Sequence, residues 1–209
     1  MFSLQAMFGK GERFYELLEQ SAMAACESAD ALAALLANGT EAPLMAAFNA
    51  SHMREKELAA QISEELMNTF VTALDREDIE ALNSALYKIP KTIEKFAERY
   101  EIIAERVAGV DFAQRAKVLT QSTKVVAEMI AQLRRSLQID PMKKLQDRLQ
   151  ALESEGDRML LAPYRTLYVE GNDVMRAMLA KDLFELIEKA IDKCRDVGNI
   201  VYSIVLKNS

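Results

Sequence analysis

Acidic residues recur every three or four positions near the end of the chain, a spacing that suits metal ligands on one helix. They are Glu185, Glu188, Asp192 and Asp196. At 100° per residue these four fall within a helical sector of about 80°. Carboxylate oxygens are the ligands that hard cations prefer, and two residues four apart can serve one ion. The alternative is a solvated face, on which Lys189, Lys193 and Arg195 relieve the repulsion among the acids.

A second acidic pair lies upstream, where Glu153 and Asp157 are one helical turn apart on the flank of an apolar stripe. This flank could face the last helix and bring the pair near Asp192 and Asp196. Four carboxylates close together repel one another unless a counter-ion is present. The spacing therefore raises the hypothesis of a site for a divalent or ferric ion (Mg, Mn or Fe) formed by Glu153, Asp157, Asp192 and Asp196.

The sequence contains no motif for a di-iron centre or for a phosphate-binding loop. The only histidine, His52, lacks the Glu-x-x-His spacing of the ferritin-like di-iron proteins, and Gly9-Lys10-Gly11 lacks the spacing of a phosphate-binding loop. A metal-dependent enzyme built on the four carboxylates would need an open coordination position and an enclosed pocket, which a solvent-facing stripe does not supply. We therefore predict a protein that is not an enzyme, with the metal-dependent enzyme as the alternative.

Helices must position these residues, because apolar side chains recur at spacings of three and four and no sustained alternation of period two occurs. The sequence predicts an all-α protein of six helices. The first five predicted spans are about Glu12–Asn38, Pro43–Phe70, Asp75–Ile103, Phe112–Leu137 and Asp140–Leu160. The last helix follows a break at residues 171–173 and is strongly amphipathic from Asp182 to Ile204. Asp75 and Asp140 are expected to cap the helices that they open, and Pro90 is expected to kink the third helix.

Composition narrows the class of protein. The 209 residues are 50% apolar and 28% charged, which excludes intrinsic disorder, and the net charge of −6 disfavours binding to nucleic acid. No apolar run has the length of a signal peptide or a membrane span. Cys26 and Cys194 lie within apolar helical patterns and are interpreted as core residues in a reducing compartment. We expect a soluble, cytoplasmic protein that does not insert into the membrane.

The chain also shows a weak internal similarity. Residues 76–82 match residues 181–187 at an offset of 105 positions, each at the start of the third helix of a set of three. A duplication explains this match economically. We predict a single domain over residues 1–209, with one repeat at about residues 10–108 and the second at about residues 110–209.

Three motifs and the end of the chain together resemble a known family. The segments are Phe70–Ile79 (FVTALDREDI), Leu152–Asp157 (LESEGD), Asp192–Ile200 (DKCRDVGNI) and Ile204–Asn208 (IVLKN). In this order they resemble the PhoU-like Pit accessory proteins, over nearly the full length. The resemblance implies a six-helix PhoU-type fold of two tandem three-helix bundles. It also implies a cytoplasmic regulator or accessory of a Pit-type transporter of inorganic phosphate, or of sulfate, at the inner face of the membrane.

The resemblance further implies where a metal ion would bind. PhoU proteins carry Glu/Asp-x-x-x-Asp motifs in both bundles, and this chain keeps them only in the second bundle. The corresponding first-bundle positions hold His52, Lys56, Tyr87 and Lys91. Lysine repels a cation, so we predict one cation site in the second half and none in the first, or no metal at all.

Two further features bear on partners. Met7, Met45, Met53 and Met67 are most simply explained as core filling, and the alternative is a set of adaptable apolar contacts at the surface. A homodimer is also predicted, and a purely structural module that dimerises through apolar helix faces is a further alternative function.

Overall fold

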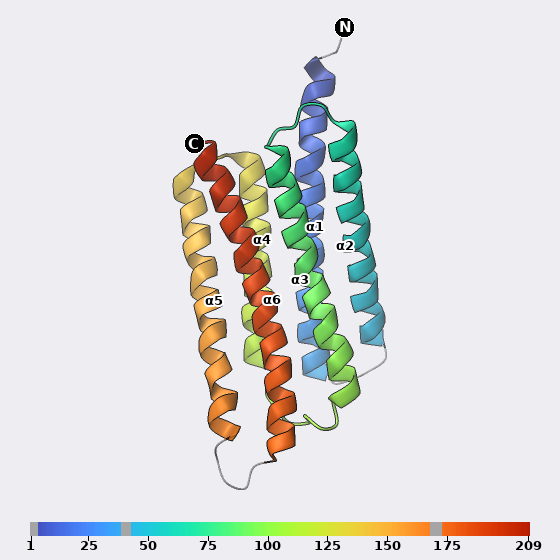
Figure 1. Ribbon diagram of the computed structural model, residues 1–209, viewed down its shortest axis with the longest axis vertical. Helices are drawn as coiled ribbons and strands as arrows, with labels where there is room; N and C mark the ends of the chain where they lie inside the picture. The colour runs from blue at the N-terminus through green and yellow to red at the C-terminus, as the bar shows by residue number, and fades with distance from the viewer. Residues whose placement is uncertain (1–3, 39–42, 168–172) are drawn as a thin grey trace.

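The computed structural model describes residues 4–38, 43–167 and 173–209, and over these residues the chain forms six α-helices and no strands. The helices run side by side along the long axis of the molecule (Figure 1). Their bounds are α1 Leu4–Asn38, α2 Pro43–Asn68, α3 Arg76–Ile103, α4 Ala113–Arg135, α5 Ile139–Leu167 and α6 Val174–Lys207. The predicted all-α class is confirmed.

The helices are arranged as two three-helix bundles. Helices α1, α2 and α3 pack against one another, and so do α4, α5 and α6. The bundles meet through α1 against α4 and α3 against α6, whereas α2 and α5 each contact only their own bundle. The predicted pair of tandem bundles is therefore confirmed, and the internal duplication stays a prediction.

Apolar side chains at helical spacing build one continuous core. On α6 the buried residues follow the predicted apolar face: Leu183, Leu186, Ile187, Ala190, Ile191, Cys194, Val197, Val201 and Ile204. Both Cys26 and Cys194 are buried and free, as their apolar surroundings in the sequence predicted. None of the helices in the described part of the chain is long and apolar enough to span a membrane.

The predicted helix starts are wrong for α1 and α5. Helix α1 begins at Leu4 rather than Glu12, whereas α6 begins at Val174, directly after the predicted break at residues 171–173. The start of α6 has a local cause, because the Asp173 side chain accepts a hydrogen bond from the Arg176 backbone N–H at 3.1 Å and so caps the helix.

Helix α5 begins at Ile139, so Asp140 lies inside the first turn instead of capping it. Asp75 does precede α3 as predicted, but its backbone carbonyl, not its side chain, accepts from the N–H groups of Asp78 and Ile79. Helix α3 runs without interruption through Pro90. The predicted breaks at residues 39–40 and 171–172 lie outside the described residues.

Candidate functional site

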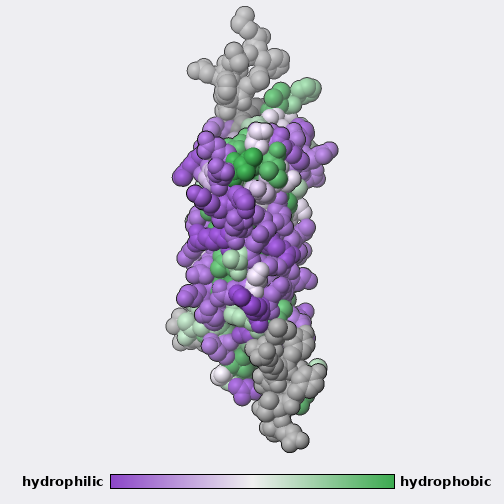
Figure 2. All heavy atoms as spheres, turned by 90° about the vertical axis from the view of Figure 1, so that its left-hand side faces the viewer, coloured by the Kyte–Doolittle hydropathy of each residue, from purple (hydrophilic) through white to green (hydrophobic). Residues whose placement is uncertain are grey.

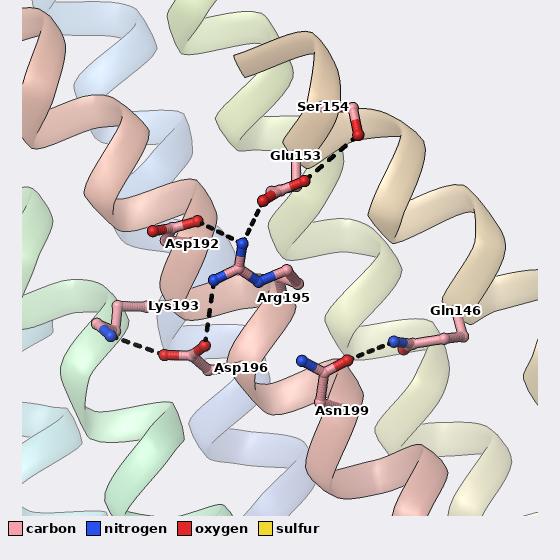
Figure 3. A network of polar contacts seen from close by, with 8 residues as sticks. All are labelled: Gln146, Glu153, Ser154, Asp192, Lys193, Arg195, Asp196 and Asn199. Atoms are coloured by element: carbon pink, nitrogen blue, oxygen red, sulfur yellow. Dashed lines mark hydrogen bonds and ion pairs between the residues drawn. The ribbon is translucent and has the colours of Figure 1, made fainter. Parts of the chain in front are cut away.

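The acidic residues of α5 and α6 are brought together by an unusually close helix contact. A Cβ atom at Gly198 would lie 2.5 Å from Leu149 Cδ2 and 2.9 Å from Gln146 Oε1, so only glycine permits this approach. Beside it, the Gln146 Nε2 donates to Asn199 Oδ1 at 2.6 Å (Figure 3). The contact places Glu153 of α5 opposite Arg195 of α6.

Arg195 lies at the centre of the acidic residues (Figure 3). Its guanidinium donates to the Glu153 carboxylate and lies 3.0 Å from Asp192 Oδ1 and 3.7 Å from Asp196 Oδ1. The second oxygen of Asp196 accepts from Lys193 Nζ at 2.7 Å. We call Arg195 with Glu153, Asp192 and Asp196 the Arg195 cluster.

The cluster is partly withdrawn from solvent, which strengthens its ion pairs. The Glu153 side chain is 15% exposed and the Arg195 side chain 32%. Burial acts to lower the pKa of Arg195, but Asp192 and Glu153 outweigh it, and the pKa lies above its ordinary value. The guanidinium therefore keeps its charge and balances carboxylates that would otherwise repel one another.

The remaining acids of the stripe lie beside the cluster. Asp157 is exposed, and the ion pairs of Arg195 within the described part of the chain go to Glu153, Asp192 and Asp196 instead. Partial burial raises the pKa of Glu188 to about 7, and the charges of Asp192 and Asp157 add to this shift. Glu185 forms an ion pair with Lys181 at 2.5 Å. Glu188 therefore still experiences repulsion from the carboxylates of Asp192 and Asp157.

This geometry does not fit a metal ion as it stands. Three of the four predicted ligands, Glu153, Asp192 and Asp196, turn oxygens toward a guanidinium. Across the described helices no group of three or more His, Cys, Asp or Glu side chains is arranged to hold an ion. An ion ligated by these carboxylates would have to displace Arg195. The predicted cation site stays a prediction, and so does the alternative of no metal at all.

Sequence reasoning undervalued Arg195. It placed this residue among the basic side chains that relieve repulsion on a solvated face, and Lys193 and Arg195 do neutralise acids there. What the spacing did not reveal was that Arg195 also reaches across to α5. The available signal was Gly198 one turn later, because a glycine inside an apolar helix face marks a close approach.

The corresponding region of the first bundle is built from aromatic contacts. The rings of His52 and Tyr87 lie 5.7 Å apart, and Lys91 Nζ lies 5.3 Å from the centre of the Tyr87 ring. His52 Nδ1 lies 3.5 Å from Glu94 Oε2. Lys56 is exposed. The four residues that the resemblance marked as departures thus leave the first bundle without a carboxylate pair at this position.

A buried acid of the first bundle was missed entirely. Glu55 on α2 is fully buried, and its oxygens make no hydrogen bond of good geometry within the described part of the chain. Burial raises the pKa of Glu55 to about 8, with Ser21 and Arg54 acting weakly in the opposite direction. The carboxyl is therefore mostly protonated at neutral pH. The sequence did hold a signal for this burial, because Glu55 lies seven residues after Phe48 and seven before Ile62, on the apolar face of α2.

The chain has the fold of the PhoU-like proteins. Two crystal structures of PhoU-like proteins from Shewanella oneidensis MR-1 match it with TM-scores of 0.77 and 0.74. Each match covers 93% of this chain and 99% of the other, at 16% sequence identity. The second of these proteins is provisionally named a PhoU-like phosphate regulatory protein. The likeness confirms the predicted PhoU-type fold.

Relatives by sequence agree with the fold. A protein of Rhizobium meliloti (strain 1021), provisionally named a pit accessory protein, is 21% identical over 206 residues, which are 94% of each chain. The UPF0111 protein YkaA of Bacillus subtilis (strain 168) is 24% identical over 149 residues, 69% of this chain and 70% of that one. No family model matches the chain. The resemblance to PhoU-like Pit accessory proteins is thereby confirmed.

Proposed function

We propose that this protein is a non-enzymatic regulator or accessory of a Pit-type inorganic phosphate transporter, acting by docking at the cytoplasmic face of the membrane. The observation that carries the proposal is the match to the Rhizobium meliloti protein, which spans 94% of both chains and is provisionally named a pit accessory protein. The fold supports it, because a protein of Shewanella oneidensis that is provisionally named a PhoU-like phosphate regulatory protein shares it.

The geometry of the acidic residues supports a role without catalysis. An enzyme using these carboxylates would need an open coordination position. Arg195 lies between Glu153, Asp192 and Asp196 (Figure 3), and the side chains of this cluster are 15% to 38% exposed. This arrangement weighs against the alternative of a metal-dependent enzyme.

Docking would regulate transport by favouring one conformation of the transporter. A rigid bundle that binds one transporter state more tightly than another shifts the population toward that state. The Arg195 cluster keeps its charges paired without an added ion, so we expect this regulation to proceed in the presence of a chelator. The predicted homodimer stays a prediction that sedimentation would test.

Transport in proteoliposomes tests the proposal directly. A Pit-type transporter from the same genome is reconstituted, and phosphate uptake is measured with and without the full chain on the cytoplasmic side, in EDTA. We expect the chain to change the uptake rate severalfold at saturation. An unrelated amino-acid carrier in the same lipid is the control and should not respond. Unchanged phosphate uptake at a saturating concentration of the chain would contradict the proposal.

A further inference from the structure

The loop between α2 and α3 presents large apolar side chains to solvent at one end of the bundle. Phe70 is 100% exposed and Met67 77% exposed, and Val71 beside them is also exposed. We call these three residues the apolar tip. On the face drawn in Figure 2, apolar atoms gather toward the ends of the molecule, and the middle of the bundle is mostly hydrophilic. A fully exposed phenylalanine next to two other apolar side chains is typical of a binding surface.

The tip is held in place by its own loop. The Arg76 guanidinium donates to the Thr69 carbonyl at 2.7 Å and to the Leu66 carbonyl, so it caps the end of α2. Thr72 Oγ1 donates to the Leu74 carbonyl at 2.6 Å, and both Thr69 and Leu74 are buried. The exposed residues thus stand between two anchored positions. Preorganisation of this kind lowers the entropic cost of binding.

The surroundings of the tip are strongly acidic. Residues 61–80 hold six acidic side chains and one basic side chain, Arg76, in a chain whose net charge is −6. The acids are Glu64, Glu65, Asp75, Glu77, Asp78 and Glu80. Arg76 is already bound to the α2 carbonyls, and the nearby Lys207 is paired with Asp78 at 2.7 Å. An open hollow of about 520 Å³, lined in part by Asp75 and Glu77, lies beside the loop.

We propose that the apolar tip and its acidic rim dock a basic, apolar segment of the transporter, a cytoplasmic loop that carries Lys or Arg beside large apolar side chains. This proposal rests on the proposed function. Cytoplasmic loops of membrane proteins are enriched in Lys and Arg, which complements the rim. The same rim repels anionic lipid, so the charge favours a protein segment over the bilayer surface.

Binding to transporter nanodiscs tests the assignment. The full chain is titrated onto the Pit-type transporter in phosphatidylcholine nanodiscs, and onto empty nanodiscs of phosphatidylcholine or phosphatidylglycerol. We expect the transporter nanodiscs to bind and both empty ones not to bind. Phe70→Ala should weaken the affinity about tenfold, because exposed aromatic residues dominate such contacts. Glu64→Lys should weaken it about threefold and reduce its dependence on salt.

Ile102→Ala is the matched control. Ile102 is 81% exposed near the far end of α3, about 40 Å from the tip along a helix of 28 residues. Its affinity should stay within about twofold of the wild type. Equal effects of Phe70→Ala and Ile102→Ala would overturn the docking surface and leave the proposed function standing. Binding to empty phosphatidylglycerol nanodiscs would overturn it in favour of lipid. No binding of the wild type to transporter nanodiscs would overturn both proposals.

Discussion

In the second bundle Arg195 of α6 reaches Glu153 of α5, whereas in the first bundle α2 and α3 meet at the corresponding place through His52 and Tyr87. One helix pair is joined by charge and the other by aromatic contact. The same pair of helical positions can therefore be stabilised by different chemistry within one fold. The charged solution keeps its carboxylates only because a guanidinium is built in beside them.

The buried side of the two outer helices differs as well. If His52 corresponds to Glu153, then Glu55 corresponds to Gly156, since each lies three residues further along its helix. At Gly156 a Cβ atom would lie 3.2 Å from Ile191 Cδ1, so there is little room for a side chain. The first bundle places a whole carboxyl group at this position and buries it without a counter-ion. At this position the second bundle has a glycine that allows close helix packing, whereas the first bundle has a buried glutamate.

The largest expected effect is on the helix contact of the second bundle. Gly198→Val should lower the free energy of unfolding by about 3 kcal/mol, because its side chain would overlap Leu149 and Gln146. Urea unfolding followed by circular dichroism measures it. Gly156→Ala is the control and should change stability by less than about 1 kcal/mol, since only the end of the Ile191 side chain must move. Wild-type stability of Gly198→Val would show that α5 and α6 are not in close contact.

The next effect concerns the buried acid of the first bundle. The pKa of Glu55 is about 8 in the folded protein and its ordinary value is 4.5, so the folded protein holds an extra proton between these pH values. Stability should therefore fall as pH rises through this window, by up to about 1.4 kcal/mol per pH unit. Glu55→Gln should remove that loss, which urea unfolding at pH 5 and pH 8.5 measures.

The exposed Glu57→Gln is the matched control for charge on α2 and should keep the wild-type pH dependence. If Glu55→Gln and Glu57→Gln both retained the full pH dependence, burial of Glu55 without a counter-ion would be refuted.

A smaller effect is expected from the charged centre of the second bundle. Arg195→Gln leaves Glu153 and Asp192 unpaired and should cost about 1 to 2 kcal/mol at pH 7, less at high salt because the repulsion is then screened. Lys193→Gln removes only a partly exposed pair with Asp196 and should cost less than about 0.5 kcal/mol. Thermal unfolding at low and high salt compares the two, and equal losses would count against a central role for Arg195.

The smallest expected effect on stability comes from the contact between Lys91 and the Tyr87 ring in the first bundle. A double-mutant cycle of Tyr87→Leu and Lys91→Met should give a coupling energy of about 0.5 kcal/mol, since Lys91 lies over the ring near the surface. Urea unfolding of the two single variants and the double variant measures it. A coupling energy of zero would mean that the two residues are neighbours but do not stabilise the protein through their contact.

Periodicity predicted the helices and the bundles because both follow from apolar spacing. It could not predict that α1 begins at Leu4, eight residues before Glu12, since a helix can extend past its apolar face. It also favoured core filling for the methionines, which is wrong for Met53 and Met67, since both are exposed. The side chains of Met7 and Met45 lie outside the described residues.

The site was predicted less completely than the fold. The four carboxylates follow from spacing, and three of them do come together around one cation. That this cation is the side chain of Arg195 depends on how closely α5 approaches α6, which is a property of tertiary packing rather than of spacing. The burial of Glu55 follows from its place on the apolar face of α2, in line with Phe48 and Ile62, and it was missed because glutamate is ordinarily exposed.

Calorimetric titration of Mn²⁺ into chelator-treated protein tests most directly whether Arg195 takes the place of an ion. We expect no stoichiometric binding to the wild type, and measurable binding to Arg195→Gln, in which Glu153, Asp192 and Asp196 are left without their guanidinium. Near-stoichiometric binding to the wild type that is lost in the Asp192→Ala, Asp196→Ala double variant would contradict this and restore the cation site predicted from the sequence.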